Sequence, residues 1–216
     1  MIRNMSSSLF TLFFLLSSVK ALGQWSEKQY QDFKDSDVVS HPFFQEKFNI
    51  KQIDYGRLSA AMFFLTNMER EKLGLSKLAY SVELEAAAFL HTKEMGDKNF
   101  YAHINPFDSK RREPADRARM AGVQNPHTAE NILYEFGYIH VQDTYLSVAK
   151  RCVQNWMNSK GHRDNILSKD GQALGCGVYF DGVRLLCAQS FQWYEPIKRG
   201  DAVDKLPKDY SKLYSH

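Results

Sequence analysis

The sequence predicts an α+β fold in which an antiparallel sheet is covered by helices. Three segments carry apolar residues at helical spacing, and two apolar segments late in the chain are joined by Asp181-Gly182, a strong hairpin signal. The order is therefore helix, helix, strand, helix, hairpin. With 216 residues, the chain is long enough for one domain with a sizeable core plus terminal extensions.

Residues 1–23 are predicted to form a secretory signal peptide. Arg3 supplies a positive charge, residues 9–19 supply an apolar run, and Ala21-Leu22-Gly23 is a small-residue cleavage site. The apolar run is too short to span a bilayer, and a retained anchor is the alternative. We therefore expect a secreted or periplasmic protein without a transmembrane anchor.

The rest of the chain divides into an arm, a domain and a tail. Residues 24–53 are polar and aromatic without a clear period, so we interpret them as an N-terminal arm. The periodic segments fall within residues 54–197, which we take as the domain. Residues 198–216 are charged and aperiodic, which predicts a loose C-terminal tail.

Start and stop signals mark the helices of the domain. Asp54 and Ser81 are typical N-cap residues for the first two long helices, which should end near Gly74 and Gly96. The third long helix has the clearest apolar stripe, and Gly161 is expected to end it. The predicted elements are helices at about 55–72, 81–96, 114–121 and 141–159, a strand at 129–136 and a hairpin at 173–191.

The three cysteines are informative because disulfides persist outside the cytoplasm. A two-residue turn at Asp181-Gly182 would place Cys176 opposite Cys187, at a hydrogen-bonded pair whose backbones stand about 5.5 Å apart. We therefore predict a disulfide between Cys176 and Cys187, with two reduced core cysteines as the alternative. Cys152 lies on the apolar stripe of the third long helix and is left over.

Charge and motifs exclude several classes of function. The formal net charge is +3, and loss of Arg3 and Lys20 with the signal would leave +1. This charge is too small to indicate a nucleic-acid-binding protein. The chain lacks the phosphate-binding loop, the dinucleotide fingerprint, the H-E-x-x-H zinc motif and the G-x-S-x-G nucleophile motif. An enzymatic function therefore has no standard motif to rest on.

Three polar residues in apolar or turn-forming surroundings are the candidates for chemistry, namely His103, Glu130 and His162. Two imidazoles can bind a divalent ion and leave positions open for water. A neighbouring carboxylate can orient a histidine or act as a base. For any single histidine, a capping or hydrogen-bonded structural role is the alternative.

Several sequence blocks resemble one known superfamily. They are N-x-E-R-x-x-L-G-L-x-x-L at 67–78, L-E-A-A-A-F-L-H-T-K-E-M with F-Y-A-H-I-N-P, A-E-N-I, and W-M-N-S-x-G-H-R-x-N-I-L with L-G-C-G-V. Over about residues 54–195 they resemble the cysteine-rich secretory, antigen 5 and pathogenesis-related-1 (CAP or SCP) superfamily, especially its short bacterial secreted branch. The resemblance implies an α-β-α sandwich with a small antiparallel sheet between helices.

The resemblance also implies a cleft lined by two histidines and two glutamates, whose histidines bind zinc or another divalent cation in some members. His103 and His162 match the histidines, and Glu130 matches one glutamate. Ser159 stands in the place of the second glutamate, so paired acid and base chemistry lacks a carboxylate. We therefore expect a cleft that binds a divalent metal through His103 and His162, or a small ligand or lipid.

Two other functions stay open. A metal-assisted hydrolase or peptidase would place both histidines on the ion and use Glu130 to activate water. A cell-envelope interaction protein would make its contacts through the arm and the tail, although the sequence identifies no protein partner. The missing second carboxylate favours binding over catalysis.

Overall fold

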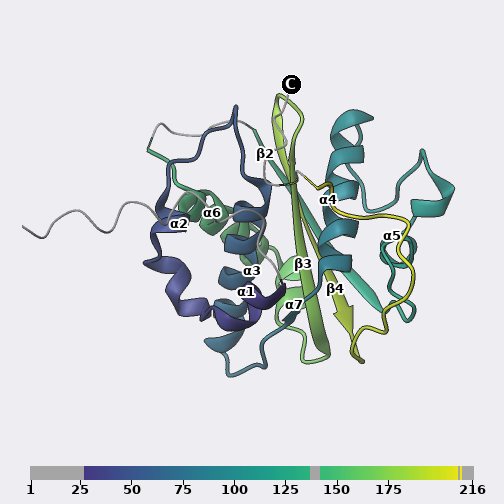
Figure 1. Ribbon diagram of the computed structural model, residues 1–216, viewed down its shortest axis with the longest axis horizontal. Coiled ribbons are helices and arrows are strands. Elements are labelled where there is room, and N and C mark those ends of the chain that lie inside the picture. Colours follow the sequence, from purple (N-terminus) through teal and green to yellow (C-terminus); the bar gives the residue numbers. More distant parts are fainter. Residues whose placement is uncertain (1–26, 137–141, 209, 211–216) are drawn as a thin grey trace, which may run out of the picture.

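The computed structural model describes residues 27–136, 142–208 and 210. A four-stranded sheet lies in the middle of the molecule, with helices on both faces (Figure 1). β1 is parallel to β3, and the other neighbouring strands are antiparallel. The predicted α-β-α sandwich with a small, mainly antiparallel sheet is confirmed. In sheet order the strands are β1 (Ala79–Tyr80), β3 (Gly171–Phe180), β4 (Arg184–Trp193) and β2 (Thr128–Phe136).

The helices form one layer on each face of the sheet (Figure 1). α3 (Tyr55–Glu71) and α6 (Tyr145–Asn158) cover one face, whereas α4 (Val82–Asp97) and α5 (Pro114–Met120) cover the other. The main core fills the space between α3, α6 and the sheet, and Trp156 is fully buried there. Among the described helices, none is long and apolar enough to cross a membrane.

Close packing of α4 on β3 depends on two glycines. A Cβ atom at Gly175 would lie 2.0 Å from the backbone nitrogen of Glu85, and one at Gly177 would lie 2.1 Å from that of Phe89. No side chain fits at either position, because glycine in a strand is needed where another backbone approaches closely. The L-G-C-G-V block therefore lets the helix lie directly against the sheet.

The cap residues of the first two long helices act as the sequence predicts. The Asp54 carboxylate accepts the N–H of Arg57 at 3.0 Å, and the Ser81 hydroxyl accepts the N–H of Leu84 at 3.1 Å. α3, α4 and α5 thus confirm the predicted helices to within about two residues. The start predicted for the third long helix, residue 141, lies outside the described residues.

The break after α6 lies at Ser159 and not at Gly161. Ser159 has an extended backbone with φ −90° and ψ 123°, and α7 (Lys160–Ile166) begins directly after it. Gly161 lies in the first turn of α7 and has no positive φ. The prediction that Gly161 ends the helix is therefore wrong, because one extended residue before it already interrupts the helical hydrogen bonds. His162 follows in the first turn of α7.

The hairpin turn lies one residue later than the sequence predicts, because the N–H of Asp181 donates to the backbone oxygen of Arg184 at 3.1 Å and Gly182 and Val183 lie between them. Oδ1 of Asp181 accepts the N–H groups of Val183 at 2.9 Å and Arg184 at 2.6 Å, and Gly182 has a φ of +96°. An aspartate side chain that accepts backbone N–H groups two and three residues on stabilises a turn that begins after it, so Asp181 flanks the turn. The strands therefore pair in a register shifted by two residues from the expected one.

The predicted disulfide between Cys176 and Cys187 is wrong for this reason. Cys176 faces Gln189 on the neighbouring strand, and Cys187 faces Val178. The two cysteines are diagonal neighbours and not opposite residues. Both are free and buried, and so is Cys152.

The predicted arm packs on the domain over its described part. It forms α1 (Glu27–Asp32), a short 3-10 helix, η2 (Asp35–Val39), and α2 (Pro42–Gln45). Phe43 and Phe44 are buried in the main core. Aromatic residues that lacked a sequence period thus anchor this segment, because burial of large rings needs no regular spacing.

The described part of the predicted tail, 198–208 and Tyr210, also packs on the domain, which differs from the loose tail that composition suggested. Arg111 holds Asp204 in an ion pair at 2.5 Å. Tyr210 is fully buried, and its hydroxyl lies 2.9 Å from the hydroxyl of Ser59 on α3. A charged composition without apolar periodicity was therefore not a sign of disorder in this described part of the tail. The domain limits drawn from the sequence stay predictions.

Candidate functional site

Glu130 on β2 is the centre of the candidate site. Its side chain is buried, and each carboxylate oxygen has a partner. Oε1 lies 2.9 Å from Nδ1 of His103, and Oε2 accepts a 2.6 Å bond from Nη2 of Arg117. Burial alone would raise the pKa of Glu130, but the bond from His103 and the charge of Arg117 outweigh it and lower the pKa. Glu130 is therefore a buried, ionised carboxylate.

His103 lies on the loop that follows α4, and its side chain is 49% exposed. The loop is held by Asn105, which is buried, accepts the N–H of Phe107 through its side chain and bonds Glu94 of α4. Because the ionised Glu130 can only accept, Nδ1 of His103 carries the hydrogen. This leaves Nε2 as the ring nitrogen with a free lone pair, on a side chain that is half-exposed.

Arg117 on α5 links the loop to the strand. The same Nη2 that bonds Glu130 also donates to the backbone oxygen of His103 at 3.0 Å, and Nη1 donates to the oxygens of Arg111 and Arg112. The side chain is almost fully buried. Arg117 thus neutralises Glu130 and fixes the backbone of His103 beside it.

His162 reaches the same neighbourhood from α7. Its backbone oxygen accepts a 3.0 Å bond from the side chain of Asn131, the residue after Glu130, and Asn165 donates to Asn131 at 2.8 Å. Burial lowers the pKa of His162, and the proximity of His103 lowers it further. The structure therefore brings three of the predicted residues together: His103, Glu130 and His162.

Ser159 is the fourth predicted cleft residue, and the structure does not join it to this group. It lies half-buried at the junction of α6 and α7 and makes no side-chain capping bond. Within the described ranges, no hydrogen bond connects its hydroxyl to Glu130, His103 or His162. Ser159 shapes the site through the backbone break that begins α7.

Sequence reasoning missed two members of the cluster, Arg117 and His91. His91 is fully buried on α4, with Nε2 at 3.0 Å from the oxygen of Ala102 and 3.9 Å from Oε1 of Glu130. Burial lowers its pKa to about 4, so the ring is neutral. The apolar stripe of the second helix already indicated burial of His91. No charge pattern distinguished Arg117 from its exposed neighbour Arg119.

The capacity of the cluster for a metal ion is limited to nitrogen donors. Among the residues that the structure describes, no three His, Cys, Asp or Glu side chains are placed to hold a metal ion together. Glu130 has its oxygens committed to His103 and Arg117. The donors that remain are Nε2 of His103 and the ring of His162, with water for the other positions.

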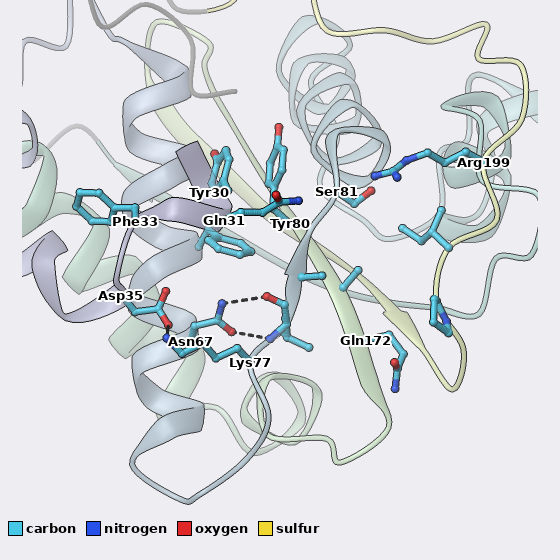
Figure 2. Close-up of a pocket in the computed structure, with 16 residues that line it drawn as sticks. Tyr30, Gln31, Phe33, Asp35, Asn67, Lys77, Tyr80, Ser81, Gln172 and Arg199 are labelled. Carbon is cyan, nitrogen blue, oxygen red and sulfur yellow. Dashed lines mark hydrogen bonds and ion pairs between the residues drawn. The ribbon is translucent and has the colours of Figure 1, made fainter. Parts of the chain in front are cut away.

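A separate cavity of about 490 Å³ lies beside β1, between the N-terminal segment and α3 on one side and residues 196–199 on the other (Figure 2). It contains none of the four predicted cleft residues. The amide of Asn67 forms its floor and pairs with the backbone of Leu78, donating to the oxygen at 3.1 Å and accepting the N–H at 2.9 Å (Figure 2). Of its cations, Lys77 pairs with Asp35 at 2.8 Å and Arg199 with Glu83 at 2.7 Å, which leaves no unpaired charge for an anion.

Comparison with known proteins gives one family. The sequence model of the cysteine-rich secretory protein family (CAP) matches residues 63–190. The chain is 34% identical over 118 residues to the uncharacterised protein YkwD of Bacillus subtilis, covering 55% of this chain and 41% of the relative. It is 32% identical over 114 residues to the uncharacterised membrane protein YlbC of the same organism, covering 53% of this chain and 29% of the relative.

A solved structure has the same fold. It is an extracellular protein containing an SCP domain from Bacillus anthracis str. Ames, 30% identical, with a TM-score of 0.52, and the match covers 64% of this chain and 41% of that one. The chain therefore spans less than half the length of these relatives. The names of these relatives state no activity.

Proposed function

Because this chain belongs to the cysteine-rich secretory protein (CAP) family, we propose that it is an exported domain that binds one divalent metal ion, with zinc as the best candidate. The protein ligands are the ring nitrogens of His103 and His162, and water fills the remaining positions. The observation that carries the proposal is the 2.9 Å bond between Glu130 and Nδ1 of His103. It leaves Nε2 of His103 with a free lone pair, and His162 lies near enough for the two rings to interact electrostatically.

The donor set fits zinc better than magnesium or calcium. Imidazole nitrogen is a ligand for zinc, copper and nickel, whereas magnesium and calcium prefer oxygen. A carboxylate behind a ligating histidine fixes the tautomer and raises the basicity of the ring, which is the arrangement of Glu130 and His103. When bound, the ion would supply a Lewis acid with open positions for a small ligand.

Several features favour binding over hydrolysis. A general base works best when its pKa lies near the operating pH, and the pKa of Glu130 is lowered. Both of its oxygens are already hydrogen-bonded, to His103 and to Arg117. Ser159 supplies no second carboxylate. Glu130 is therefore better suited to orient His103 than to activate water.

Two observations support export. Residues 1–23 have the composition of a secretory signal, and the similar domain from Bacillus anthracis belongs to an extracellular protein. Intact mass of the protein recovered outside the cytoplasm should correspond to a chain that begins at Gln24. Recovery of the full-length chain from the cytoplasm alone would contradict export.

The metal site is tested by calorimetric titration with zinc chloride. The wild-type protein should bind one ion per chain, and a His103→Ala, His162→Ala double variant should bind none. Glu130→Gln should weaken zinc binding about tenfold, because it changes the hydrogen-bond partner of the ligating His103 ring. Near-ultraviolet circular dichroism of each variant checks that the fold is retained.

A matched control separates this site from general histidine affinity. His127 has the same 49% side-chain exposure as His103 but pairs with Glu195 at 3.5 Å, outside the cluster. His127→Ala should bind zinc as the wild type does. The proposal fails if the double variant still binds one ion, or if His127→Ala loses binding to the same extent.

A further inference from the structure

Two cysteine thiols from different layers of the fold meet in the core. Sγ of Cys152 on α6 lies 3.8 Å from Sγ of Cys187 on β4, and neither residue is exposed to solvent. Cys176, on the neighbouring strand β3, interacts with the side chain of Gln189. The nearest approach between thiols is therefore between Cys152 and Cys187, and not between the two cysteines of the hairpin.

We propose that Cys152 and Cys187 form a disulfide in the exported protein, which links α6 covalently to β4. The inference rests on the export part of the proposed function, because disulfides persist in oxidising compartments outside the cytoplasm. A disulfide has an S–S distance of about 2.05 Å, whereas the two sulfur atoms lie 3.8 Å apart. A shift of less than the length of one carbon–sulfur bond therefore brings them to bonding distance. Cys176 stays reduced.

The oxidant is a small-molecule disulfide or an oxidoreductase in its disulfide form. One protein thiolate attacks a sulfur of the oxidant and expels one of its thiolates, which gives a mixed disulfide. The second protein thiolate then attacks the protein sulfur of that mixed disulfide and expels the other thiolate. In total, the two protein thiols lose two protons and two electrons, and the oxidant is reduced to two thiols.

The order of events follows from burial. Burial raises the pKa of the Cys187 thiol, and the adjacent Cys152 raises it further, so Cys187 is not a reactive thiolate in the folded protein. An oxidant also has no path to sulfur atoms that have no solvent contact. The bond must therefore form while α6 is still undocked, during folding after export.

The bond would join the two halves of the candidate site. α6 continues through Ser159 into α7, which carries His162. Cys187 pairs with Leu133 of β2, three residues after Glu130. A covalent link between Cys152 and Cys187 thus fixes the helix pair that carries His162 to the strand pair that carries Glu130, the residue that orients His103.

The test is refolding of the purified chain in a glutathione redox buffer, followed by alkylation and non-reducing peptide mapping. We expect one alkylated cysteine, Cys176, and a cross-linked peptide pair containing Cys152 and Cys187. The thermal midpoint should fall by about 5 to 10 °C when the bond is reduced, because it closes a loop of 35 residues. Three alkylated cysteines, or a cross-link to Cys176, would overturn the proposal.

Cysteine variants and the rate of oxidation of the folded protein distinguish the proposed disulfide from other pairings. Cys176→Ser should keep the cross-link, whereas Cys187→Ser should lose it without gaining another. Refolding in vitro does not depend on export, so the bond can be tested even if the protein proves to be cytoplasmic. Folded, reduced protein should resist oxidised glutathione for hours, and oxidation of the folded form as fast as the unfolded form would contradict formation during folding.

Discussion

At the scale of single residues, the charge of Glu130 depends on partners that come from distant parts of the chain. Arg117 is 13 residues away in sequence and His103 is 27. A buried carboxylate is costly unless it is paired and hydrogen-bonded. The cluster is therefore a unit, in which the histidine that can bind a ligand is oriented by a carboxylate that an arginine keeps ionised.

Replacing Arg117 should damage both stability and the site. Arg117→Met leaves the buried charge of Glu130 without its arginine partner, and breaking a buried ion pair in this way costs about 3 to 5 kcal/mol. Urea unfolding at pH 7 measures the loss. Arg119→Met is the matched control, because Arg119 is 57% exposed and pairs only with Asp116, so its loss should cost at most about 0.5 kcal/mol. Equal losses in the two variants would show that Arg117 has no special role.

At the scale of elements, the sequence predicted helices better than turns. The long helices were predictable because apolar period and cap residues are local signals, as at Asp54 and Ser81. The register of the hairpin was not, because a side-chain bond of Asp181 decides whether that residue lies inside the turn or flanks it. His103, Glu130 and His162 could be named from their motifs. Arg117 could not, because only the folded chain shows that it lies against Glu130.

The corrected helix break leads to a prediction about glycines. Gly161→Ala should stabilise the protein by about 0.5 to 1 kcal/mol, because Gly161 lies inside α7 and its Cβ would meet nothing within 4 Å. Gly177→Ala should cost more than about 3 kcal/mol, because its Cβ would overlap the backbone of α4. Thermal and urea unfolding of both variants measure the difference. Destabilisation by Gly161→Ala would restore the view that Gly161 ends the helix.

At the scale of the whole molecule, a buried glutamate joins segments from both ends of the chain. Glu85 on α4 accepts a 2.5 Å bond from the hydroxyl of Tyr80 and interacts with Tyr30 from the N-terminal segment and Tyr210 from the C-terminal one. Burial raises the pKa of Glu85 to about 8, although the tyrosine hydroxyls partly offset this. The carboxyl is therefore mostly protonated at pH 7.

This raised pKa gives a sign for the dependence of stability on pH. Between the ordinary pKa and about 8, the folded chain holds a proton on Glu85 that the unfolded chain has lost, so stability falls as the pH rises. From pH 6 to 8 the free energy of unfolding should decrease by about 2 kcal/mol relative to Glu85→Gln. Urea unfolding of both proteins at pH 6, 7 and 8 tests this. Both proteins contain His91, so its titration cancels in the difference between their free energies of unfolding. Parallel plots of that free energy against pH would exclude Glu85 as the cause.

The two hydrogen bonds between Asn67 and Leu78 affect aggregation of the protein at high concentration (Figure 2). β1 is the outermost strand of its side of the sheet, and an open strand edge is a template on which another chain can add and aggregate. The amide of Asn67 occupies both the donor and the acceptor of Leu78 that such a chain would use. The side chain of Asn67 thus closes the edge at Leu78, and Tyr30 of the N-terminal segment stacks on Tyr80 of β1, so the described part of the chain protects this edge from edge-to-edge polymerisation without a further strand.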